Sequence, residues 1–582
     1  MLPTTTLAFL TLLFTSHPVG ASPLSSHRVS GAPGIRLEHR GEDVLPVLDL
    51  PYQQVKANSY DATRDIYVFK NIPFAAPPVG DLRWRAPAPP PPNDTLADGS
   101  YGPSCVQTGI GAPLGEAGAL LGPQSEDCLY LDVYAPGAAV RGNATNLPVI
   151  HWIYGGAYVL GSKDMYAGKG LVSVSNNNVI YVASNYRVGA YGWLAGVTME
   201  QEGLPNAGLH DIHAALNWTQ QYIGLLGGDA GNVAAWGESA GAGCLFHLLT
   251  AGGGTVDPLF KRLLLQSPAF DFSWDRRGTL ENQTQKFLSD AGCAGKDVSC
   301  LRQASPEALK AANDAGTVQP YSGRTAFQVS ADGSFVRQVA ALELASGNFW
   351  KGLESVILSH VEDEALIFTD TNVTTPERFG AYLKYAFPTP GVPEVIEKQY
   401  SDYVLQTSRL HDVISGSRLV CNVRFAADAL LTGSGTKVWN MQYAVPPALH
   451  GTDLIPTFFL PDPPSNPLNS TGVLNQGYQS YLVSLSRAGD PNTFRKKLSL
   501  PATVEWSEVE NSGEFFGNVL NVGALGFSFI EDEQNSKPVC DFWQQVAAGV
   551  TNLGGYAPPG AVVEQGLLPQ TGDASANYSG VQ

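Results

Sequence analysis

The hydrophobic residues of this chain fall into short runs separated by longer segments with a helical pattern. Residues 149–154 form the first strong run, which follows Pro148 and ends at two glycines. A proline can open a strand but is not found in the middle of one, so this run predicts a strand. The other runs of this kind are 179–184, 233–236, 262–265, 355–358 and 437–439. Their residues do not alternate with polar ones, which is typical of strands covered on both faces.

Helical segments such as residues 209–223 lie between these runs and predict crossover connections. A sheet connected in this way is mainly parallel and flanked by helices, which predicts an α/β fold. Ligands bind such sheets beyond the carboxyl ends of the strands, so functional side chains are expected in the loops after the runs. No repeat and no long Ser/Gly linker divides the 582 residues, so residues 22–582 are expected to form one large domain.

Composition narrows the classes of function. Charged residues make up 15% of the chain and hydrophobic residues 44%, which supports a large core and argues against disorder. The net charge of −18 at pH 7 argues against nucleic acid as a partner, because binding to a phosphate backbone needs a basic face.

The first residues have the pattern of an export signal. Residues 7–14 are an apolar run as long as a signal-peptide core, and Val19, Gly20 and Ala21 are the small residues that a signal peptidase needs. A membrane anchor, the alternative, needs roughly 20 apolar residues, which are not present. Residues 1–21 are therefore predicted to be a cleaved signal peptide, and we expect a secreted protein without stable membrane insertion.

Seven Asn-X-Ser/Thr sequons fit a eukaryotic secretory pathway. Asn217 lies in a helical segment and is the weakest of them. The predicted glycosylation sites are Asn93, Asn143, Asn282, Asn372, Asn469 and Asn577.

The seven cysteines are an odd number for an oxidising compartment, so six can pair while one stays free. Cys244 lies in an apolar helical segment, where a free thiol behaves as a small hydrophobic side chain. A catalytic role for it is the alternative. Pairing of nearest neighbours, the simplest assumption, joins Cys105 with Cys128, Cys293 with Cys300 and Cys421 with Cys540.

One pentapeptide has the pattern of a nucleophile. Residues 237–241 read G-x-S-x-G around Ser239, between a predicted strand and the helical segment 242–249. In this context the serine hydroxyl projects from a strained turn. The pattern also arises by chance, so the hypothesis requires a carboxylate and a histidine base further along the chain.

Four histidines follow Ser239. His450 is the best base because it lies in a loop after the predicted strand 437–439. His247 is too near Ser239, and His360 and His411 lie before or among helical segments.

Three acidic residues follow the predicted strand 355–358, namely Glu362, Asp363 and Glu364. Spacing does not choose among them, and a solvated acidic turn is the alternative. The turn at Gly155, Gly156 and Ala157 follows the first strand and can present consecutive N–H groups to an oxyanion, although an ordinary tight turn would have the same sequence.

Between Tyr67 and Trp543, a series of short segments resembles the type-B carboxylesterase and lipase family and follows the order of that family's markers. This family has the α/β-hydrolase fold and also contains the cholinesterases. Residues 69–80 resemble its amino-terminal block and residues 125–131 its second signature. The pentapeptide is a further marker, and the others are residues 185–190, 206–209, 227–229, 265–267 and 488–492.

The resemblance implies a serine esterase that acts on a small ester and uses no metal and no organic cofactor. It implies Ser239 as nucleophile, Glu364 as the acid and His450, which precedes Gly451, as the base. The positions that correspond to the family's oxyanion hole are Gly156, Ala157 and Ala240. The family's disulfides transfer to the three pairs named above, and its ion pairs transfer to Arg83 with Glu126 and Arg187 with Asp211.

Two residues depart from the family pattern. Ala157 replaces a glycine, which keeps an N–H donor but adds a methyl group that could crowd bulky substrates. Ala365 replaces the glycine after the acid, which matters only if this position needs a positive φ.

The segment between Cys105 and Cys128 corresponds to a lid in the family's lipases and carries a choline-binding tryptophan in its cholinesterases. It contains no tryptophan here, so choline esters are not expected as the dedicated substrate. A short apolar flap over the site is preferred to a plain surface loop.

Other functions remain open at this point. The family's fold also supports lipase-like or sterol-esterase-like action on longer acyl chains, peptide or lactone hydrolysis, and non-catalytic adhesion or scaffold proteins. All three triad positions are filled here, which favours an enzyme. The sequence does not specify the ester.

Overall fold

The strand predicted at residues 149–154 is β8 (Leu147–Ile153), and each of the other five runs is a strand as well. They are β9 (Ile180–Ser184), β10 (Gly228–Glu238), β11 (Arg262–Gln266), β12 (Ser355–Val361) and β13 (Lys437–Ala444). The two predicted helical segments are α5 (Ala207–Tyr222) and α6 (Ala240–Leu249). The structure, a computed structural model, describes residues 33–36, 45–109, 122–316, 319–321, 323–461, 470–511 and 513–554.

These strands form the middle of a 12-stranded sheet, which confirms the predicted α/β class. Neighbours run parallel in the order β9-β8-β10-β11-β12-β13-β15. The edges are antiparallel, with β7, β5 and β4 beyond β9, and β14 and β16 beside β15. A separate four-stranded sheet has the order β1-β2-β3-β6. The remaining strands are β1 (Gly34–Arg36), β2 (Val47–Asp49), β3 (Gln53–Lys56), β4 (Ser59–Asp61), β5 (Ile66–Pro73), β6 (Asn93–Ala97), β7 (Tyr130–Pro136), β14 (Glu510–Asn511), β15 (Phe516–Gly523) and β16 (Gly526–Asp532).

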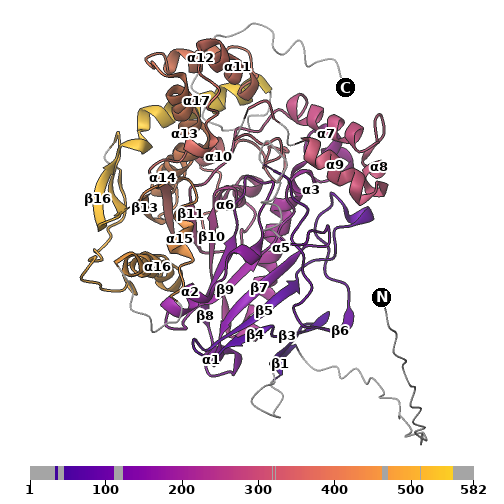
Figure 1. Cartoon of the computed structure of the whole chain (residues 1–582), viewed down its shortest axis with the longest axis vertical. Helices are drawn as coiled ribbons and strands as arrows, with labels where there is room; N and C mark the ends of the chain where they lie inside the picture. The colour runs from indigo at the N-terminus through magenta and orange to yellow at the C-terminus, as the bar shows by residue number, and fades with distance from the viewer. Residues whose placement is uncertain are drawn as a thin grey trace, which may run out of the picture.

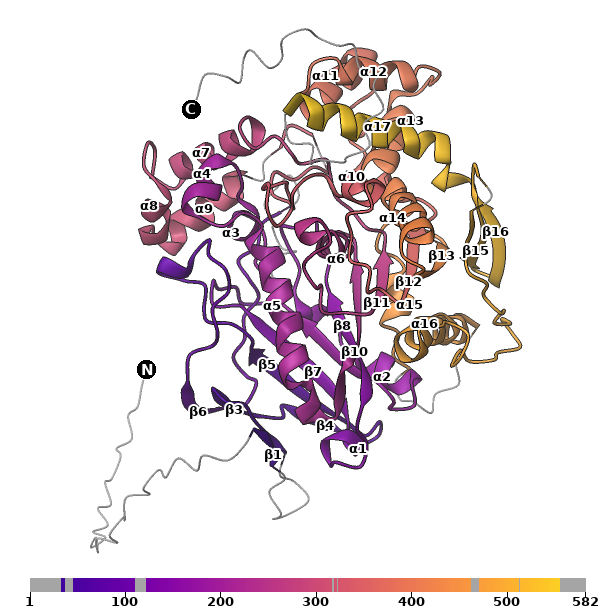
Figure 2. The same ribbon diagram turned by 180° about the vertical axis from the view of Figure 1, so that it is seen from behind.

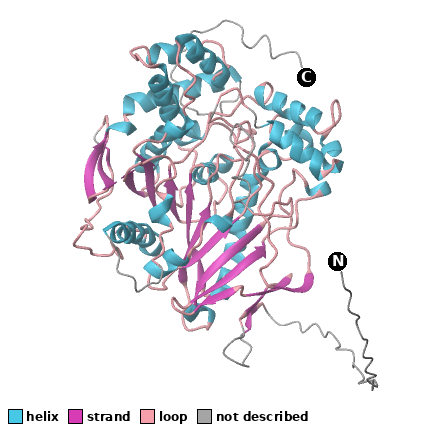
Figure 3. Cartoon of the chain, viewed as in Figure 1, coloured by secondary structure: helices cyan, strands magenta, loops and turns pink. Residues whose placement is uncertain are grey.

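Two neighbouring residues of β10 show how helices cover both faces of the sheet. The indole N–H of Trp236 donates to Ser486 Oγ in α16 (Ser470–Ala488) at 2.9 Å. A Cβ on the next residue, Gly237, would lie 2.7 Å from the carbonyl carbon of Gly241 in α6. Successive strand residues point to opposite faces, so α16 covers one face and α6 the other. Figures 1 and 2 show the helices on both sides, and Figure 3 shows the strands as a layer among them.

Further helices gather at one end of the large sheet in two groups (Figures 1 and 2). One group is α7 (Thr279–Asp290), α8 (Val298–Gln303) and α9 (Pro306–Gly316). The other is α11 (Pro376–Ala386), α12 (Val392–Gln399), α13 (Gln406–Ser415) and α17 (Lys537–Gly554). The remaining α-helices are α1 (Gly137–Val140), α2 (Lys169–Val174), α3 (Ala190–Trp193), α4 (Val197–Glu202), α10 (Ala340–Ala345), α14 (Cys421–Gly433) and α15 (Leu454–Thr457).

Both ion pairs implied by the resemblance are present. Arg83 Nε lies 2.6 Å from Glu126, and Arg187 Nε lies 2.7 Å from Asp211. Arg83 also donates to the carbonyl of Ala304 at 2.7 Å, at the end of α8. Arg83 therefore links the amino-terminal segment to the end of α8, and Arg187 fastens the loop after β9 to α5.

Covalent links follow the expected pairing. Disulfides join Cys105 with Cys128, Cys293 with Cys300, and Cys421 with Cys540. The last one ties the start of α14 to α17. Cys244 has a free thiol that is fully buried in α6.

Several expectations fall on residues outside the described ranges: the signal peptide, Asn469, Asn577 and most of the segment between Cys105 and Cys128. The sequon asparagines within those ranges are exposed: Asn93, Asn143, Asn217, Asn282 and Asn372. In the sequon of Asn217, Thr219 is buried in α5 and lies 3.0 Å from His151. Within the described ranges no helix is long and apolar enough to cross a membrane, and no group of His, Cys, Asp or Glu residues could hold a metal ion.

Candidate active site

Ser239 lies in a sharp turn between β10 and α6. Its φ of 54° and ψ of −124° are strained values for a residue with a side chain. Its N–H donates to the carbonyl of Gln266 at 2.9 Å, which fixes the turn to the end of β11. A Cβ on Gly241 would lie 2.2 Å from the carbonyl oxygen of Ile153, so this position needs glycine. The sequence of the pentapeptide therefore permits a turn that other residues would block.

The structure brings His450 and Glu364 to Ser239 in a chain of hydrogen bonds. His450 Nε2 lies 2.8 Å from Ser239 Oγ, and His450 Nδ1 lies 2.5 Å from Glu364 Oε2. The other oxygen of Glu364 accepts the N–H of Val361 at 2.8 Å. The side chain of Glu364 is fully buried and that of His450 is 6% exposed. This geometry can move a proton from the serine hydroxyl to the imidazole.

The other two acidic residues after β12 have different surroundings. Asp363 lies 2.9 Å from His411, which also bonds to Asp412 at 2.8 Å. Glu362 is exposed. The backbone thus turns only Glu364 toward His450.

The remaining histidines considered as bases have partners away from Ser239. His247 bonds to the carbonyl of Gly243 within α6 at 2.7 Å. His360 lies buried on β12, 2.8 Å from Asp532. Of the four, the structure places only His450 against the serine.

Three buried carboxyl groups surround the imidazole. Burial lowers the pKa of His450, but the charges of Glu364, Glu238 and Asp453 raise it by more, so it lies above its usual range. Burial raises the pKa of Glu364, but the imidazole beside it and the hydrogen bonds that its carboxylate accepts together hold the pKa below its usual range. The ionised Glu364 is therefore well placed to stabilise a protonated His450.

Glu238 is a residue near the site that the sequence did not single out. Its Oε1 lies 3.5 Å from His450 Nε2, and burial raises the pKa of its carboxyl group above the usual range. Its place beside Ser239 in the pentapeptide was the available signal. Asp453 is also buried here, 2.7 Å from Gln266, and burial raises its pKa to about 6.

The turn after β8 lies against the serine. A Cβ on Gly155 would lie 2.8 Å from Ser239 Cβ, and one on Gly156 would lie 2.2 Å from the carbonyl oxygen of Leu160. Within the described residues no protein group accepts the N–H of Gly156 or Ala157. Ala240 is the first residue of α6, where an N–H has no partner in its own helix. These three N–H groups are therefore available to an oxyanion.

The two departures from the family pattern have different consequences. Ala157 has a φ of 53°, a left-handed conformation that costs a residue with a Cβ about 1–2 kcal/mol. Ala365 has a φ of −92°, which suits any residue, so its replacement of glycine causes no strain.

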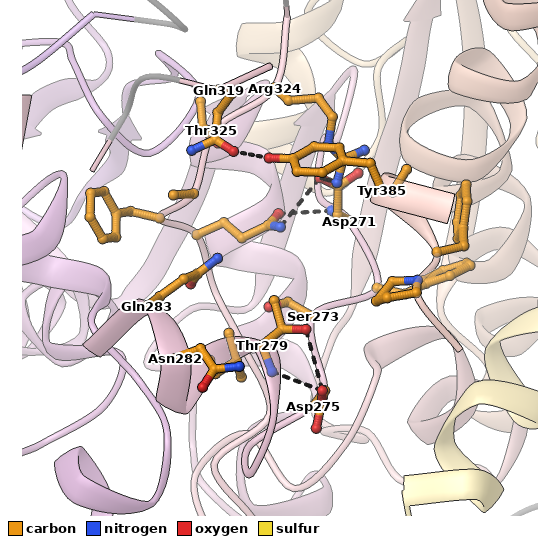
Figure 4. Close-up of a pocket in the computed structure, with 18 of the residues that line it drawn as sticks. Asp271, Ser273, Asp275, Thr279, Asn282, Gln283, Gln319, Arg324, Thr325 and Tyr385 are labelled. Atoms are coloured by element: carbon orange, nitrogen blue, oxygen red, sulfur yellow. Dashed lines mark hydrogen bonds and ion pairs between the residues drawn. The ribbon is translucent and has the colours of Figure 1, made fainter. Parts of the chain in front are cut away.

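A narrow cavity above Ser239 is lined by Ala157, Ala240, Phe270 and Phe368 among others. It adjoins a pocket of about 590 Å³, because Thr325 and Gln328 line both. Figure 4 shows the polar side chains on the walls of the larger pocket, which come from the segment 271–275 before α7, the start of α7, residues 319 and 324–325, and the end of α11. A substrate at the serine can therefore extend into a larger space.

Comparison with known proteins assigns this arrangement to a family. Residues 45–516 match the profile of the Carboxylesterase family. The chain belongs to the carboxylesterase family. This membership and the structural neighbours below make the protein a carboxylesterase of the α/β-hydrolase fold.

Fungal relatives of this carboxylesterase are similar along most of their length. A protein named secreted lipase from Arthroderma benhamiae is 40% identical over 532 residues, which are 88% of this chain and 95% of the relative. Carboxylesterase patB of Penicillium expansum is 28% identical and covers 86% of this chain and 96% of its own. The crystal structure of EstA from Aspergillus niger aligns with a TM-score of 0.72 and 26% identity, over 87% of this chain and 98% of that one.

Proposed function

We propose that this carboxylesterase is an exported enzyme that hydrolyses carboxylic esters through a covalent acyl-enzyme on Ser239. The observation that carries the proposal is the buried chain from Ser239 Oγ through His450 to Glu364, with contacts of 2.8 and 2.5 Å. A serine hydroxyl needs such a base to become a nucleophile at neutral pH.

In the proposed mechanism, Ser239 Oγ attacks the ester carbonyl carbon while His450 Nε2 takes its proton. Glu364 stabilises the imidazolium, and the N–H groups of Gly156, Ala157 and Ala240 hold the oxyanion. His450 then gives the proton to the leaving alcohol oxygen. Water, deprotonated by the same imidazole, attacks the acyl-enzyme and releases the acid.

Export is supported by several features of the chain. Residues 1–21 have the pattern of a signal peptide, and the structure contains three disulfides. The sequon asparagines within the described ranges are exposed, which suits glycosylation. The relative that is 40% identical is named a secreted lipase.

A second candidate function is lipase action on longer acyl chains. The name of that relative favours it, and so does the pocket of about 590 Å³ beside the serine. Hydrolysis rates on a chain-length series of p-nitrophenyl esters separate the two, because an esterase loses activity on long chains and a lipase gains it.

Replacement of Ser239 by Ala tests the central proposal. We expect kcat on p-nitrophenyl butyrate to fall at least about ten-thousandfold, since loss of a triad nucleophile removes covalent catalysis. Cys244→Ala is the matched control, because this thiol lies in the helix that follows the serine. The assignment is contradicted if Ser239→Ala keeps most of its activity, or if only Cys244→Ala shows a large loss of activity.

Ala157→Gly should change both stability and selectivity. Glycine adopts the φ of 53° without strain, so we expect about 1 kcal/mol of added stability. Ala157 also lines the cavity above Ser239, where its methyl group takes space that a tertiary alcohol needs.

We therefore expect little hydrolysis of tert-butyl acetate by the natural enzyme and a gain in the glycine variant, relative to p-nitrophenyl butyrate. Chemical denaturation measures the first effect and the ratio of the two rates measures the second. Ready turnover of the tertiary ester by the natural enzyme would show that the methyl group does not limit the site.

A further inference from the structure

A charged cluster lies in the wall between the cavity above Ser239 and the larger pocket. Asp271 Oδ1 lies 2.7 Å from Arg418 Nε, and Asp271 Oδ2 lies 3.3 Å from a terminal guanidinium nitrogen of Arg324. We call these three residues the Arg-Asp-Arg cluster. Figure 4 shows Asp271 and Arg324 next to each other on the pocket wall, beside Tyr385.

The cluster borders the path that a bound ester would follow. Arg418 lines the narrow cavity above Ser239, while Asp271 and Arg324 line the larger pocket. Gln328 lines both and bonds to Asp271 through its side chain. A group attached to an ester at the serine therefore passes the two guanidinium groups.

The cluster carries one more positive than negative charge. Burial raises the pKa of Asp271, but the charges of the two arginines together with hydrogen bonds from Gln328 and Arg418 hold it below its usual range, so the carboxylate is ionised. Among the described residues, no other carboxylate forms an ion pair with either arginine. The further partners are neutral: Arg324 donates to Tyr382 Oη at 3.4 Å and Arg418 to the carbonyl of Gly323 at 3.1 Å.

This excess positive charge is largely buried from solvent. The side chains of Arg324 and Arg418 are only 13% and 14% exposed. The other charged residues that line the large pocket balance one another in number, because Lys286 and Lys384 are matched by Asp275 and Asp290. An uncompensated charge with so little water is costly, and an anionic ligand would offset it.

The backbone holds the cluster in place. Arg418 lies in a π-helical turn, Gly416–Val420, that joins α13 to α14, and π-helical turns are frequent at functional sites. Its carbonyl accepts the N–H of Phe270 at 3.2 Å, next to Asp271. The N–H of Asp271 donates to Gln328 Oε1 at 2.9 Å. The guanidinium groups are thus positioned before a ligand arrives.

We propose that this enzyme prefers half-esters, meaning short esters that carry a second, ionised carboxylate, and that Arg324 and Arg418 bind this carboxylate. The inference rests on the esterase function proposed above. Hydrolysis adds water across the ester bond. If the acyl side carries the charge, the products are an alcohol and a dicarboxylate. If the alcohol side carries it, the products are a hydroxy acid and a second carboxylic acid.

The test compares charged and neutral esters of similar size on the full-length enzyme. Monoethyl glutarate against ethyl pentanoate places the charge on the acyl side, and 4-acetoxybutanoate against butyl acetate places it on the alcohol side. In one of the two pairs, we expect kcat/KM of the wild type to be at least about tenfold higher for the charged ester. A tenfold difference corresponds to the contribution of one charged hydrogen bond. Added NaCl should raise KM for that ester only.

Variants then locate the effect. Arg324→Gln should lower kcat/KM for the preferred charged ester about tenfold or more and leave the neutral ester within about twofold. Arg324→Lys, which keeps the charge, should restore most of the preference. Lys384→Gln is the matched control, because it removes an exposed positive charge from the same pocket, and the ion pairs of Asp271 among the described residues do not include Lys384.

The outcomes separate this inference from the proposed function. Hydrolysis of neutral esters with no preference for a charged one in either pair overturns the inference and leaves the esterase intact. An equal fall for both esters in Arg324→Gln, or an equal effect of Lys384→Gln, also overturns it, because the arginine then acts on structure or at long range. If the wild type hydrolyses p-nitrophenyl butyrate but none of the four esters, only this inference is overturned, whereas failure on all five esters overturns both proposals.

Discussion

Glu364→Gln is expected to lower kcat on p-nitrophenyl butyrate by about ten-thousandfold, as loss of the orienting carboxylate does in triad enzymes. Glu364 Oε2 lies 2.5 Å from His450 Nδ1, and a neutral amide there cannot stabilise the imidazolium. Its NH₂ group would also favour the wrong tautomer of the imidazole. Steady-state kinetics of the purified variant measures the loss.

Two neighbouring carboxylates provide controls for this prediction. Asp363→Asn weakens the contact with His411, and Glu362→Gln changes an exposed side chain, so both should keep kcat within about an order of magnitude of the wild type. Similar losses in all three variants would remove the special role of Glu364.

Removal of the disulfide between Cys421 and Cys540 is expected to lower the free energy of unfolding by about 5 kcal/mol, because the bridge closes a loop with a sequence separation of 119. The bridge joins α14 to α17 and is not part of the hydrogen-bonded chain of Ser239, His450 and Glu364, so kcat at moderate temperature should change little. The double variant Cys421→Ala with Cys540→Ala, unfolded in guanidinium chloride, tests this.

The bridge between Cys293 and Cys300 is the natural comparison. It closes a loop with a sequence separation of only 7, for which the chain-entropy model gives about 2 kcal/mol. If both double variants lose the same stability, loop length is not the source of the effect. A large fall in kcat with the fold intact would show that α14 and α17 support the site more directly than their position indicates.

The sequence alone was sufficient for the parts of this enzyme that depend on local physics. The central strands are short apolar runs between helical segments, so their positions follow from the hydrophobic pattern. The turn at Ser239 was predictable because the glycines around it are needed locally, as the close approach of Gly241 to Ile153 shows. The antiparallel strands at the sheet edges, such as β5 and β16, were not predicted, because they lack that uninterrupted apolar pattern.

Spacing along the chain could not choose among acidic residues that follow the same strand; the family resemblance implied Glu364, and the tertiary structure gives the physical reason. Glu362, Asp363 and Glu364 follow the same strand, and the backbone after β12 decides which of them faces His450. No pattern in the sequence indicated the Arg-Asp-Arg cluster, because Asp271, Arg324 and Arg418 come from three distant segments of the chain. Strands and tight turns arise from interactions between residues close in the chain, whereas a charged cluster forms where the packed core brings distant loops together and excludes water. Hydrophobic periodicity therefore determined the central strands, and local glycine requirements determined the turn at Ser239, whereas long-range packing decided which carboxylate faces His450 and which charges lie in the pocket wall.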